Sequence, residues 1–232
     1  MSFLKNKKIL IVAAHPDDEV LGMGGTIAKA IDQGAKITVV FLGEGVSARF
    51  SIDEYESEEF KKQSSLRMEG AERALRLLGV EHYVFGSRLC TQFDQYSRLS
   101  IVKEVERYID EFRPDMLFTH NPIEVNIDHV ITYEVVECAC RPVNINSPSE
   151  IYTFEIVCSG SWKFDTSFNP NVYVDVSDYF DSKLSAWHEY VGEDRPFPFP
   201  RSDTGLSTLA KYRGMASGLK MAEGFRLVRC IK

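Results

Sequence analysis

Short apolar runs alternate with longer amphipathic segments along the first two thirds of the chain. The run Lys8–Ala14 is typical of a strand that is buried on both faces. By the same reasoning we expect strands at 35–43, 82–85 and 115–120, and helices at 25–33, 54–78, 97–112 and 126–141. Strands that alternate with helices predict an α/β fold with a Rossmann-like, mostly parallel sheet and helices on both faces.

The last third of the chain is less regular. We expect strands at 151–157, 171–177 and 225–231, helices at 183–190 and 204–221, and a proline-rich loop around 193–203. No repeat, low-complexity tract or shift in composition divides the sequence, so residues 1–232 are predicted to form a single domain. A chain of this length with 44% hydrophobic residues can bury one good core.

Charge and cysteine usage exclude several function classes. The formal net charge of −7 argues against binding to nucleic acid or to an anionic membrane. No apolar run approaches the roughly 20 residues that a membrane helix needs. The segment MSFLKNKK has no secretory pattern, and the five dispersed cysteines form no Cys-x-x-Cys pair. We therefore expect a cytoplasmic protein, and we leave its oligomeric state open, homo-oligomers included.

The segment AHPDDEVLGMGG places three carboxylates in a row beside His15, just beyond the first strand. Adjacent carboxylates repel one another, and a bound cation would offset that repulsion. His15 and Asp18 offer nitrogen and oxygen ligands, and a catalytic zinc usually takes three protein ligands and keeps a position open for water. Ligands of parallel sheets bind beyond the carboxyl ends of the strands. The third metal ligand is therefore expected in the segment THNPIEVNIDHV, which supplies His120 and His129.

Each of these residues also has an ordinary structural explanation. Acidic residues favour the first turn of a helix, and Asn126 is a good N-cap residue. Two His–Asp clusters at one sheet edge nevertheless favour a metal site over several separate structural roles. The glycines of GMGG, followed by Glu44 about 20 residues on, match the dinucleotide fingerprint poorly. Seven residues, three of them acidic, separate the strand from the first glycine, so close packing of the helix on the sheet is the preferred interpretation.

The same residues resemble a known family. AHPDDEVLGMGG is similar to the signature of the PIG-L/LmbE-like proteins, which are zinc-dependent N-deacetylases of N-acetylglucosamine conjugates, and NIDH at 126–129 aligns with their His-Pro-Asp-His signature. The segments LRMEGAERALRLLGV and YRGMASGLKMAEGFRLVR also resemble family segments, so the resemblance spans nearly the whole chain. It implies one Zn²⁺ per chain held by His15, Asp18 and His129, with Asp17 as general base. The same nitrogen and oxygen donors would also accept another divalent metal.

Two positions depart from the family pattern. Asn126 replaces a histidine that is credited with stabilising the oxyanion and helping to protonate the leaving amine, and Arg67 is followed three residues later by Gly70 rather than glutamate. An asparagine amide can donate a hydrogen bond but cannot transfer a proton. We read Asn126 as a variant of an active site rather than as the mark of a lost one.

The resemblance suggests a division of labour around the scissile amide. Asp17 would take the proton of the attacking water and return it to the amine, while Asn126 would donate a hydrogen bond to the oxyanion. His120 is a second candidate proton donor, weighed equally against a role as a buried strand-end histidine. Asp128 would orient a neighbouring residue of the site.

The substrate predicted from the resemblance is an N-acetylated amino sugar, nucleotide- or lipid-linked and destined for a surface glycan. Its candidate contacts are Arg49, Arg67, Arg195 and Arg201. Trp162 and Trp187 are candidate sugar platforms, but we expect both to lie in the core. The alternatives are a hydrolase of another sugar amide, such as an N-formyl or carbamoyl group, and an inactive relative that binds a sugar or nucleotide.

Overall fold

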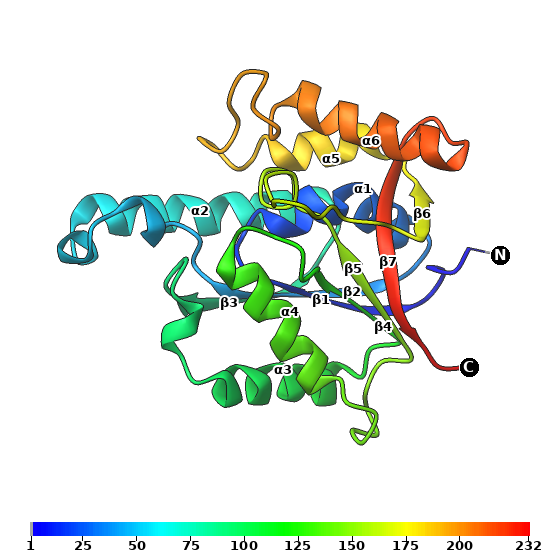
Figure 1. Cartoon of the computed structure of the whole chain (residues 1–232), viewed down its shortest axis with the longest axis horizontal. Coiled ribbons are helices and arrows are strands. Elements are labelled where there is room, and N and C mark those ends of the chain that lie inside the picture. Colours follow the sequence, from blue (N-terminus) through cyan, green and yellow to red (C-terminus); the bar gives the residue numbers. More distant parts are fainter. Residues whose placement is uncertain (1) are drawn as a thin grey trace.

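Seven strands form one sheet within residues 2–232, the part of the chain that the computed structural model describes (Figure 1). Their spatial order is β3 (His82–Arg88), β2 (Lys36–Gly43), β1 (Lys8–Ala13), β4 (Met116–His120), β5 (Glu150–Phe154), β7 (Ala222–Cys230) and β6 (Val172–Asp175). Neighbours from β3 to β5 are parallel, whereas β7 runs antiparallel to both β5 and β6. The sheet is mostly parallel, which confirms the predicted fold class.

Helices cover both faces of the sheet (Figure 1). One face carries α1 (Asp18–Asp32), α2 (Glu58–Leu77), α5 (Phe180–Trp187) and α6 (Asp203–Ser217), and the other carries α3 (Arg98–Phe112) and α4 (Ile127–Ala139). Short 3₁₀ turns at Ser47–Arg49, Ile52–Glu54 and Phe93–Gln95 lie in the loops. Within the described residues, none of the helices combines the length and apolarity needed to cross a membrane.

The apolar run of β1 supplies both layers of the core. Ile9, Ile11 and Ala13 pack in the cluster beneath α1 and α2, whereas Leu10 and Val12 pack in the cluster with α3 and α4. This alternation follows from the two-residue period of a strand. Each fully buried aliphatic side chain contributes about 1.5–3 kcal/mol. A strand covered on both faces needs no polar positions, which explains why the sequence shows an unbroken run.

The register of the central strands brings distant segments to one edge of the sheet. Val12 in β1 pairs with Thr119 in β4, and Ala13 pairs with Phe41 in β2. The residues that follow β1 and those that end β4 therefore emerge side by side. A separate surface hollow, lined by Lys36 and His82 among others, lies at the opposite edge, where β2 and β3 begin.

Helix α1 begins at Asp18, seven residues before the predicted start. The glycines of GMGG therefore lie inside the helix, where they permit close packing. A Cβ atom at Gly22 would lie 2.6 Å from the Phe154 ring, and one at Gly25 would lie 2.9 Å from Val176. The helix is also kinked at Met23, whose φ of −154° is not helical. The prediction missed this start because glycine-rich segments disfavour helix in isolation, whereas burial against β5 selects them here.

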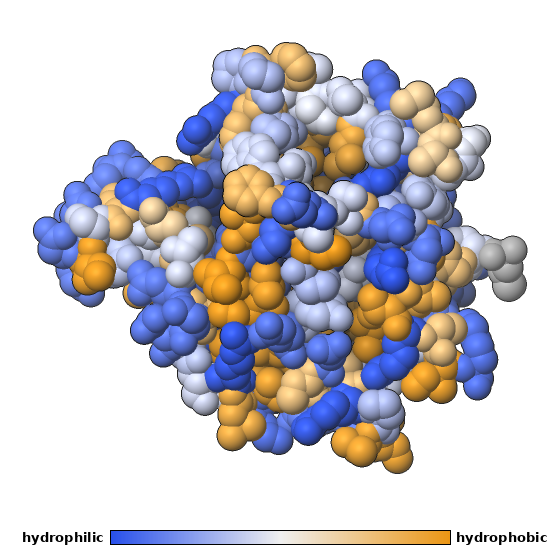
Figure 2. All heavy atoms as spheres, viewed as in Figure 1, coloured by the Kyte–Doolittle hydropathy of each residue, from blue (hydrophilic) through white to orange (hydrophobic). Residues whose placement is uncertain are grey.

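For the other helices, the observed boundaries lie closer to the predicted ones. Helix α2 begins after an N-cap at Ser57, and α5 occupies Phe180–Trp187 rather than 183–190. Helix α6 ends earlier than predicted because Gly218 adopts a left-handed conformation with φ of 75°. Figure 2 shows hydrophilic residues over most of the protruding end of α2, where the side chains of Glu56 and Glu58 are almost fully exposed.

Candidate metal and catalytic site

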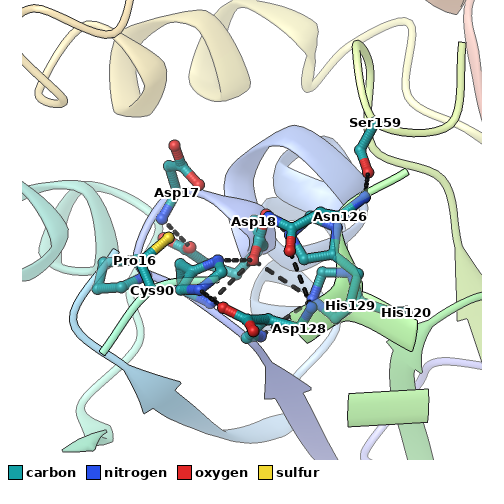
Figure 3. A network of polar contacts seen from close by, with 12 residues as sticks. Pro16, Asp17, Asp18, Cys90, His120, Asn126, Asp128, His129 and Ser159 are labelled. Carbon is teal, nitrogen blue, oxygen red and sulfur yellow. Dashed lines mark hydrogen bonds and ion pairs between the residues drawn. The ribbon is translucent and has the colours of Figure 1, made fainter. Parts of the chain in front are cut away.

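The predicted metal ligands come together at the carboxyl edge of the sheet (Figure 3). His15 and Asp18 leave β1, and His129 lies in the first turn of α4, which follows β4. Asp18 Oδ1 lies 3.4 Å from His129 Nε2, and Asp18 Oδ2 lies 3.7 Å from His15 Nδ1. One ligand atom from each of the three lies within 4.8 Å of the others, and all three residues are buried.

The Asp18 carboxylate has one oxygen that lacks a donor. Oδ2 accepts the backbone N–H of His15 at 2.9 Å, whereas the buried Oδ1 has no hydrogen-bond partner. Despite burial, the neighbouring histidines His129, His120 and His15 hold the pKa of Asp18 below its usual range. An unpartnered carboxylate oxygen that faces the His129 imidazole is suited to a divalent cation, and the donor set of two imidazoles and one carboxylate matches zinc. The residues present therefore fit the metal that the sequence predicts.

Each candidate histidine ligand forms a hydrogen bond with a second carboxylate through the ring nitrogen that does not face Asp18. His15 Nε2 donates to Asp128 Oδ2 at 2.9 Å, and His129 Nδ1 donates to Glu124. Asp128 Oδ1 in turn accepts the Phe93 N–H at 3.0 Å. Such carboxylates fix the orientation and tautomer of a metal-binding imidazole. The residue that Asp128 orients is thus His15, a partner that the sequence did not identify.

His120 lies behind this ligand set. It is fully buried and stacks on the His129 ring at a centroid distance of 4.0 Å. Its Nε2 accepts the Ala14 N–H at 3.0 Å and also lies 3.3 Å from Asp18 Oδ2. The remaining nitrogen, Nδ1, is 3.9 Å from Glu124. In this position the His120 ring contacts the strand ends and the proposed metal ligands, and none of its faces is open to solvent.

The adjacent Asp17 carboxylate points the other way, away from the histidine cluster (Figure 3). Its Oδ2 accepts hydrogen bonds from Arg67 Nη1 at 2.6 Å and from Arg201 Nη1 at 3.0 Å. Among the described residues, no donor contacts Oδ1. Burial raises the pKa of Asp17, and Arg201 and Arg67 offset only part of that rise. The pKa values of the two neighbouring carboxylates are therefore shifted in opposite directions. This pattern is typical of active sites in which one carboxylate stays ionised and the other exchanges a proton.

The backbone at Asp17 is unusual for a non-glycine residue. Its φ of 119° lies in the positive region that L-residues rarely adopt. The Asp17 N–H donates to Glu19 Oε2 at 3.1 Å, and the Tyr190 hydroxyl donates to the other oxygen of Glu19. Such strain persists only where the surrounding contacts enforce it, and it is typical of functional positions. It lets Asp17 and Asp18 face different partners.

Asn126 caps α4. Its Oδ1 accepts the Asp128 N–H at 2.9 Å, and its own N–H donates to the Ser159 hydroxyl at 3.1 Å. The cap uses the carbonyl oxygen of the side-chain amide. The two Nδ2 hydrogens have no acceptor among the described residues and remain available beside the ligand set.

The predicted recognition residues have different surroundings. Arg67 and Arg201 contact Asp17, as described above, and Arg49 donates to Glu193 at 2.6 Å. Arg195 lies over the Phe199 ring, 5.1 Å from its centroid. The preference for a core position is confirmed for Trp187, which is fully buried, but it is wrong for Trp162, which is 55% exposed. Trp162 follows a surface loop that offers it one aromatic neighbour, Phe199, rather than a core.

Three site residues were not found by sequence reasoning. Glu19 supports the Asp17 backbone, buried Glu193 contacts Arg67 and Arg49, and the Cys90 thiol lies beside His15 and Asp128. The acidic run did contain Glu19, but the sequence holds no signal for Glu193 or Cys90, whose partners are distant in the chain. Glu44, the acid considered in a nucleotide motif, instead accepts the N–H groups of its own loop and of Cys90.

Comparison with known proteins decides the family. Residues 10–140 match the PIG-L sequence family, described as GlcNAc-PI de-N-acetylase. The chain is also 30% identical to diacetylchitobiose deacetylase of Thermococcus kodakarensis, with 96% of this chain and 83% of the relative covered. The chain belongs to the PIG-L family. PIG-L membership places it among de-N-acetylases, which hydrolyse amide bonds, and it confirms the resemblance expected from the sequence.

Solved structures agree with the PIG-L fold. N,N′-diacetylchitobiose deacetylase from Pyrococcus horikoshii is 28% identical with a TM-score of 0.76, covering 96% of this chain and 84% of that one. The 4-carboxy-2-hydroxymuconate hydratase GalB from Pseudomonas putida KT2440 is 20% identical with a TM-score of 0.75, covering 97% and 98%. A hydratase shares the fold, so the activity of this PIG-L protein has to be argued from its site rather than from its fold.

Proposed function

We propose that the protein is a metal-dependent N-deacetylase that removes the acetyl group from an N-acetylated amino sugar. The observation that carries the proposal is the Asp18 oxygen that lacks a donor and faces His129, next to an Asp17 carboxylate held separately by two arginines. A ligand set and an independent buried base are the two parts that hydrolysis of an amide requires.

His15, Asp18 and His129 would hold the metal, and zinc suits two imidazoles and one carboxylate. When bound, such an ion polarises a carbonyl and lowers the pKa of water to about 7. The protein contributes the geometry. Asp128 and Glu124 fix the two imidazole rings, which keeps both ring nitrogens that face Asp18 available as lone-pair donors. We assign His120 a positioning role as well, because it packs on His129 and has no face toward a substrate.

Asp17 is the proposed general base. Arg67 and Arg201 fix Oδ2, so Oδ1 is the atom left to accept the proton of the attacking water. A pKa raised by burial makes the Asp17 carboxylate a better base toward the attacking water, and the leaving amine is a stronger base still, so the proton can pass on to it. The same Oδ1 would therefore carry the proton from water to the leaving nitrogen. With this route, the reaction needs no further proton donor in place of the family histidine that Asn126 replaces.

Asn126 is the proposed hydrogen-bond donor to the developing oxyanion. Its Nδ2 hydrogens are free because Oδ1 alone forms the helix cap. One preorganised donor of this kind contributes about 3–4 kcal/mol to transition-state stabilisation in other enzymes. The residue can thus cap α4 and serve the reaction at the same time.

For the substrate, we propose a class of compounds rather than one molecule. The relatives named above act on N-acetylated sugars by their names, and Arg49 and Arg195 offer donors for hydroxyls or for an acidic carrier. A nucleotide- or lipid-linked sugar in surface-glycan synthesis, and a cytoplasmic location suited to five free cysteines, remain parts of the proposal. N-formyl and carbamoyl sugars are the alternative amides. The second candidate is an inactive relative that binds a sugar or nucleotide, and the feature that favours it is Asn126 in place of the family's histidine.

The test combines metal content with turnover. Wild type, His129→Ala and Asp17→Asn are purified identically, analysed for metal by mass spectrometry, and assayed for amine release from N-acetyl and N-formyl amino sugars. We expect about one metal equivalent in wild type and Asp17→Asn, and loss in His129→Ala. Turnover by Asp17→Asn should fall by about 10²–10⁴-fold, the usual contribution of general acid–base catalysis. Metal-loaded Asp17→Asn that is fully active would overturn the mechanism.

A further inference from the structure

Two arginines bind the proposed base through only one of its two carboxylate oxygens. Asp17 Oδ2 accepts from Arg67 Nη1 at 2.6 Å and from Arg201 Nη1 at 3.0 Å, whereas Oδ1 has no donor among the described residues. A guanidinium and a carboxylate frequently pair through two parallel hydrogen bonds, one to each oxygen. The contact with a single oxygen therefore implies that another group holds the second nitrogen of Arg67.

Glu193 is that group. Its Oε1 pairs with Arg67 Nη2 and accepts from Arg49 Nη2 at 2.6 Å. Its Oε2 lies 3.7 Å from Arg201 Nη1. The side chains of Asp17, Arg67 and Glu193 are each at most 7% exposed. Because water is largely excluded, an arginine nitrogen that lost Glu193 would need another acceptor within the protein.

The segment that carries Glu193 is packed closely against α2. A Cβ atom at Gly70 would lie 2.7 Å from the Glu189 carbonyl oxygen, so a larger residue there would push this segment away. Gly70 is also the position at which the sequence departs from the family pattern. The Tyr190 hydroxyl of the same segment donates to Glu19, which supports the backbone of the proposed base. Glu193 is thus delivered to the site by a segment that is fixed on both sides.

We propose that Glu193 is a positioning residue that keeps Asp17 available as a base, because it holds Arg67 in an orientation that cannot reach both oxygens of Asp17. This inference rests on the proposed deacetylase function. Without Glu193, the Arg67 guanidinium would turn to form the two-pronged pair with Asp17. Oδ1 would then accept an arginine hydrogen bond at the moment when it has to accept the proton of the attacking water.

The kinetic test uses Glu193→Gln with N,N′-diacetylchitobiose as substrate. We expect kcat to fall about 10–100-fold, the usual consequence of a misplaced catalytic group, while KM and metal content change little. Glu189→Gln is the matched control and should keep the wild-type kcat, since Glu189 lies in the same segment but accepts from Arg73 of α2 at 2.7 Å. Assays well below the melting temperature of every variant exclude unfolding as the cause. Wild-type kcat in Glu193→Gln, or an equal loss in Glu189→Gln, would overturn the inference.

A second substitution distinguishes control of Arg67 from a purely structural role. Lysine carries a single ammonium group and lacks the planar fork that binds both carboxylate oxygens. Arg67→Lys alone should lower kcat, yet the combination of Glu193→Gln with Arg67→Lys should have a higher kcat than Glu193→Gln alone. Two independent structural defects would instead add their losses. A double variant that is no more active than Glu193→Gln would contradict the proposed role.

Crystal structures separate this inference from the reaction. In zinc-loaded Glu193→Gln we expect the Arg67 guanidinium to contact both oxygens of Asp17, whereas Oδ1 should stay free of arginine in wild type and in Glu189→Gln. Should wild type release no acetate from any sugar, the proposed function fails while these structures still decide whether Glu193 controls Arg67. A Glu193→Gln structure in which Oδ1 remains free refutes the inference even for an active enzyme.

Discussion

Asn126 shows how one side chain can serve structure and chemistry with different atoms. Its Oδ1 caps α4, while its Nδ2 is free to donate to an oxyanion. The two roles can be separated because aspartate caps helices as well as asparagine does but has no side-chain donor when ionised.

Asn126→Asp should therefore keep the stability of the wild type and lose activity. We expect the free energy of unfolding to change by less than about 0.5 kcal/mol and kcat to fall about 10²–10³-fold, as for loss of one oxyanion donor. Asn126→Ala should lose activity and about 1 kcal/mol of capping stability as well. Asn126→His, which restores the family residue, should be tolerated. Wild-type kcat in both Asp and Ala variants would reduce Asn126 to a cap.

The ion pairs of Glu193 should make a contribution to stability that depends on pH. It is buried, yet Arg67 and Arg49 lower its pKa below the ordinary value of 4.5. A lowered folded-state pKa means that the ion pairs contribute stability above the unfolded pKa, and that this contribution is lost as the pH falls through the folded value. Denaturant titrations of wild type and Glu193→Gln should differ by about 3 kcal/mol at pH 7. The difference should shrink below about pH 4.5. A gap that is constant from pH 7 to 3 would contradict the assignment.

Among the elements, α1 carries the most unusual design. Its kink at Met23 interrupts the regular helical hydrogen bonds, and two residues from other elements replace them. Glu223 of β7 accepts the N–H groups of Gly25 at 3.1 Å and Thr26 at 2.7 Å, and Lys183 of α5 donates to the Leu21 carbonyl at 2.8 Å. Lys183 and Glu223 also form a buried ion pair at 2.6 Å. The kinked helix that starts at Asp18 is thus held by the C-terminal third of the chain.

Breaking this ion pair should destabilise the protein far more than breaking an exposed one. Lys183→Met leaves the Glu223 carboxylate without its cation, and removal of one partner from a buried pair costs about 3–5 kcal/mol. Lys103→Met is the matched control, since Lys103 is mostly exposed and pairs with Glu106, and it should cost less than about 1 kcal/mol. Urea denaturation of the two variants measures both values. Similar losses would show that the kink does not depend on Lys183.

On the scale of the whole molecule, sequence patterns predicted those structural features that depend on residues close together in the chain. The unbroken run of β1 and the His-x-x-Asp spacing reflect local periodicity. The rule that sites lie at the strand ends left the third metal ligand open between His120 and His129, and the family resemblance implied His129. The start of α1, the pairing of Asp128 with His15 and the exposure of Trp162 depend on contacts across the fold. No local rule encodes a contact between residues more than a hundred positions apart, as in Asp128 with His15.

The same long-range contacts would make a metal held by the proposed ligands a link between the segments that follow β1 and β4. His15 and Asp18 follow β1, whereas His129 belongs to α4, so an ion bound to all three would favour the folded state over the unfolded one. At a free metal concentration of 100 Kd the stabilisation is about 2.7 kcal/mol. For a chain of this size we therefore expect chelation to lower Tm by roughly 5–10 °C.

His129→Ala and His188→Ala separate this link from general effects of the chelator. His129→Ala should melt at a temperature that chelation does not change, because the ligand set is already broken. His188→Ala removes a half-exposed histidine outside the ligand set and should show the full wild-type response. Differential scanning calorimetry with and without chelator, followed by titration of zinc back into the chelated protein, measures all three. Equal shifts in wild type and His129→Ala would place the stabilising ion elsewhere and would remove the physical basis for assigning Asp18 as its ligand.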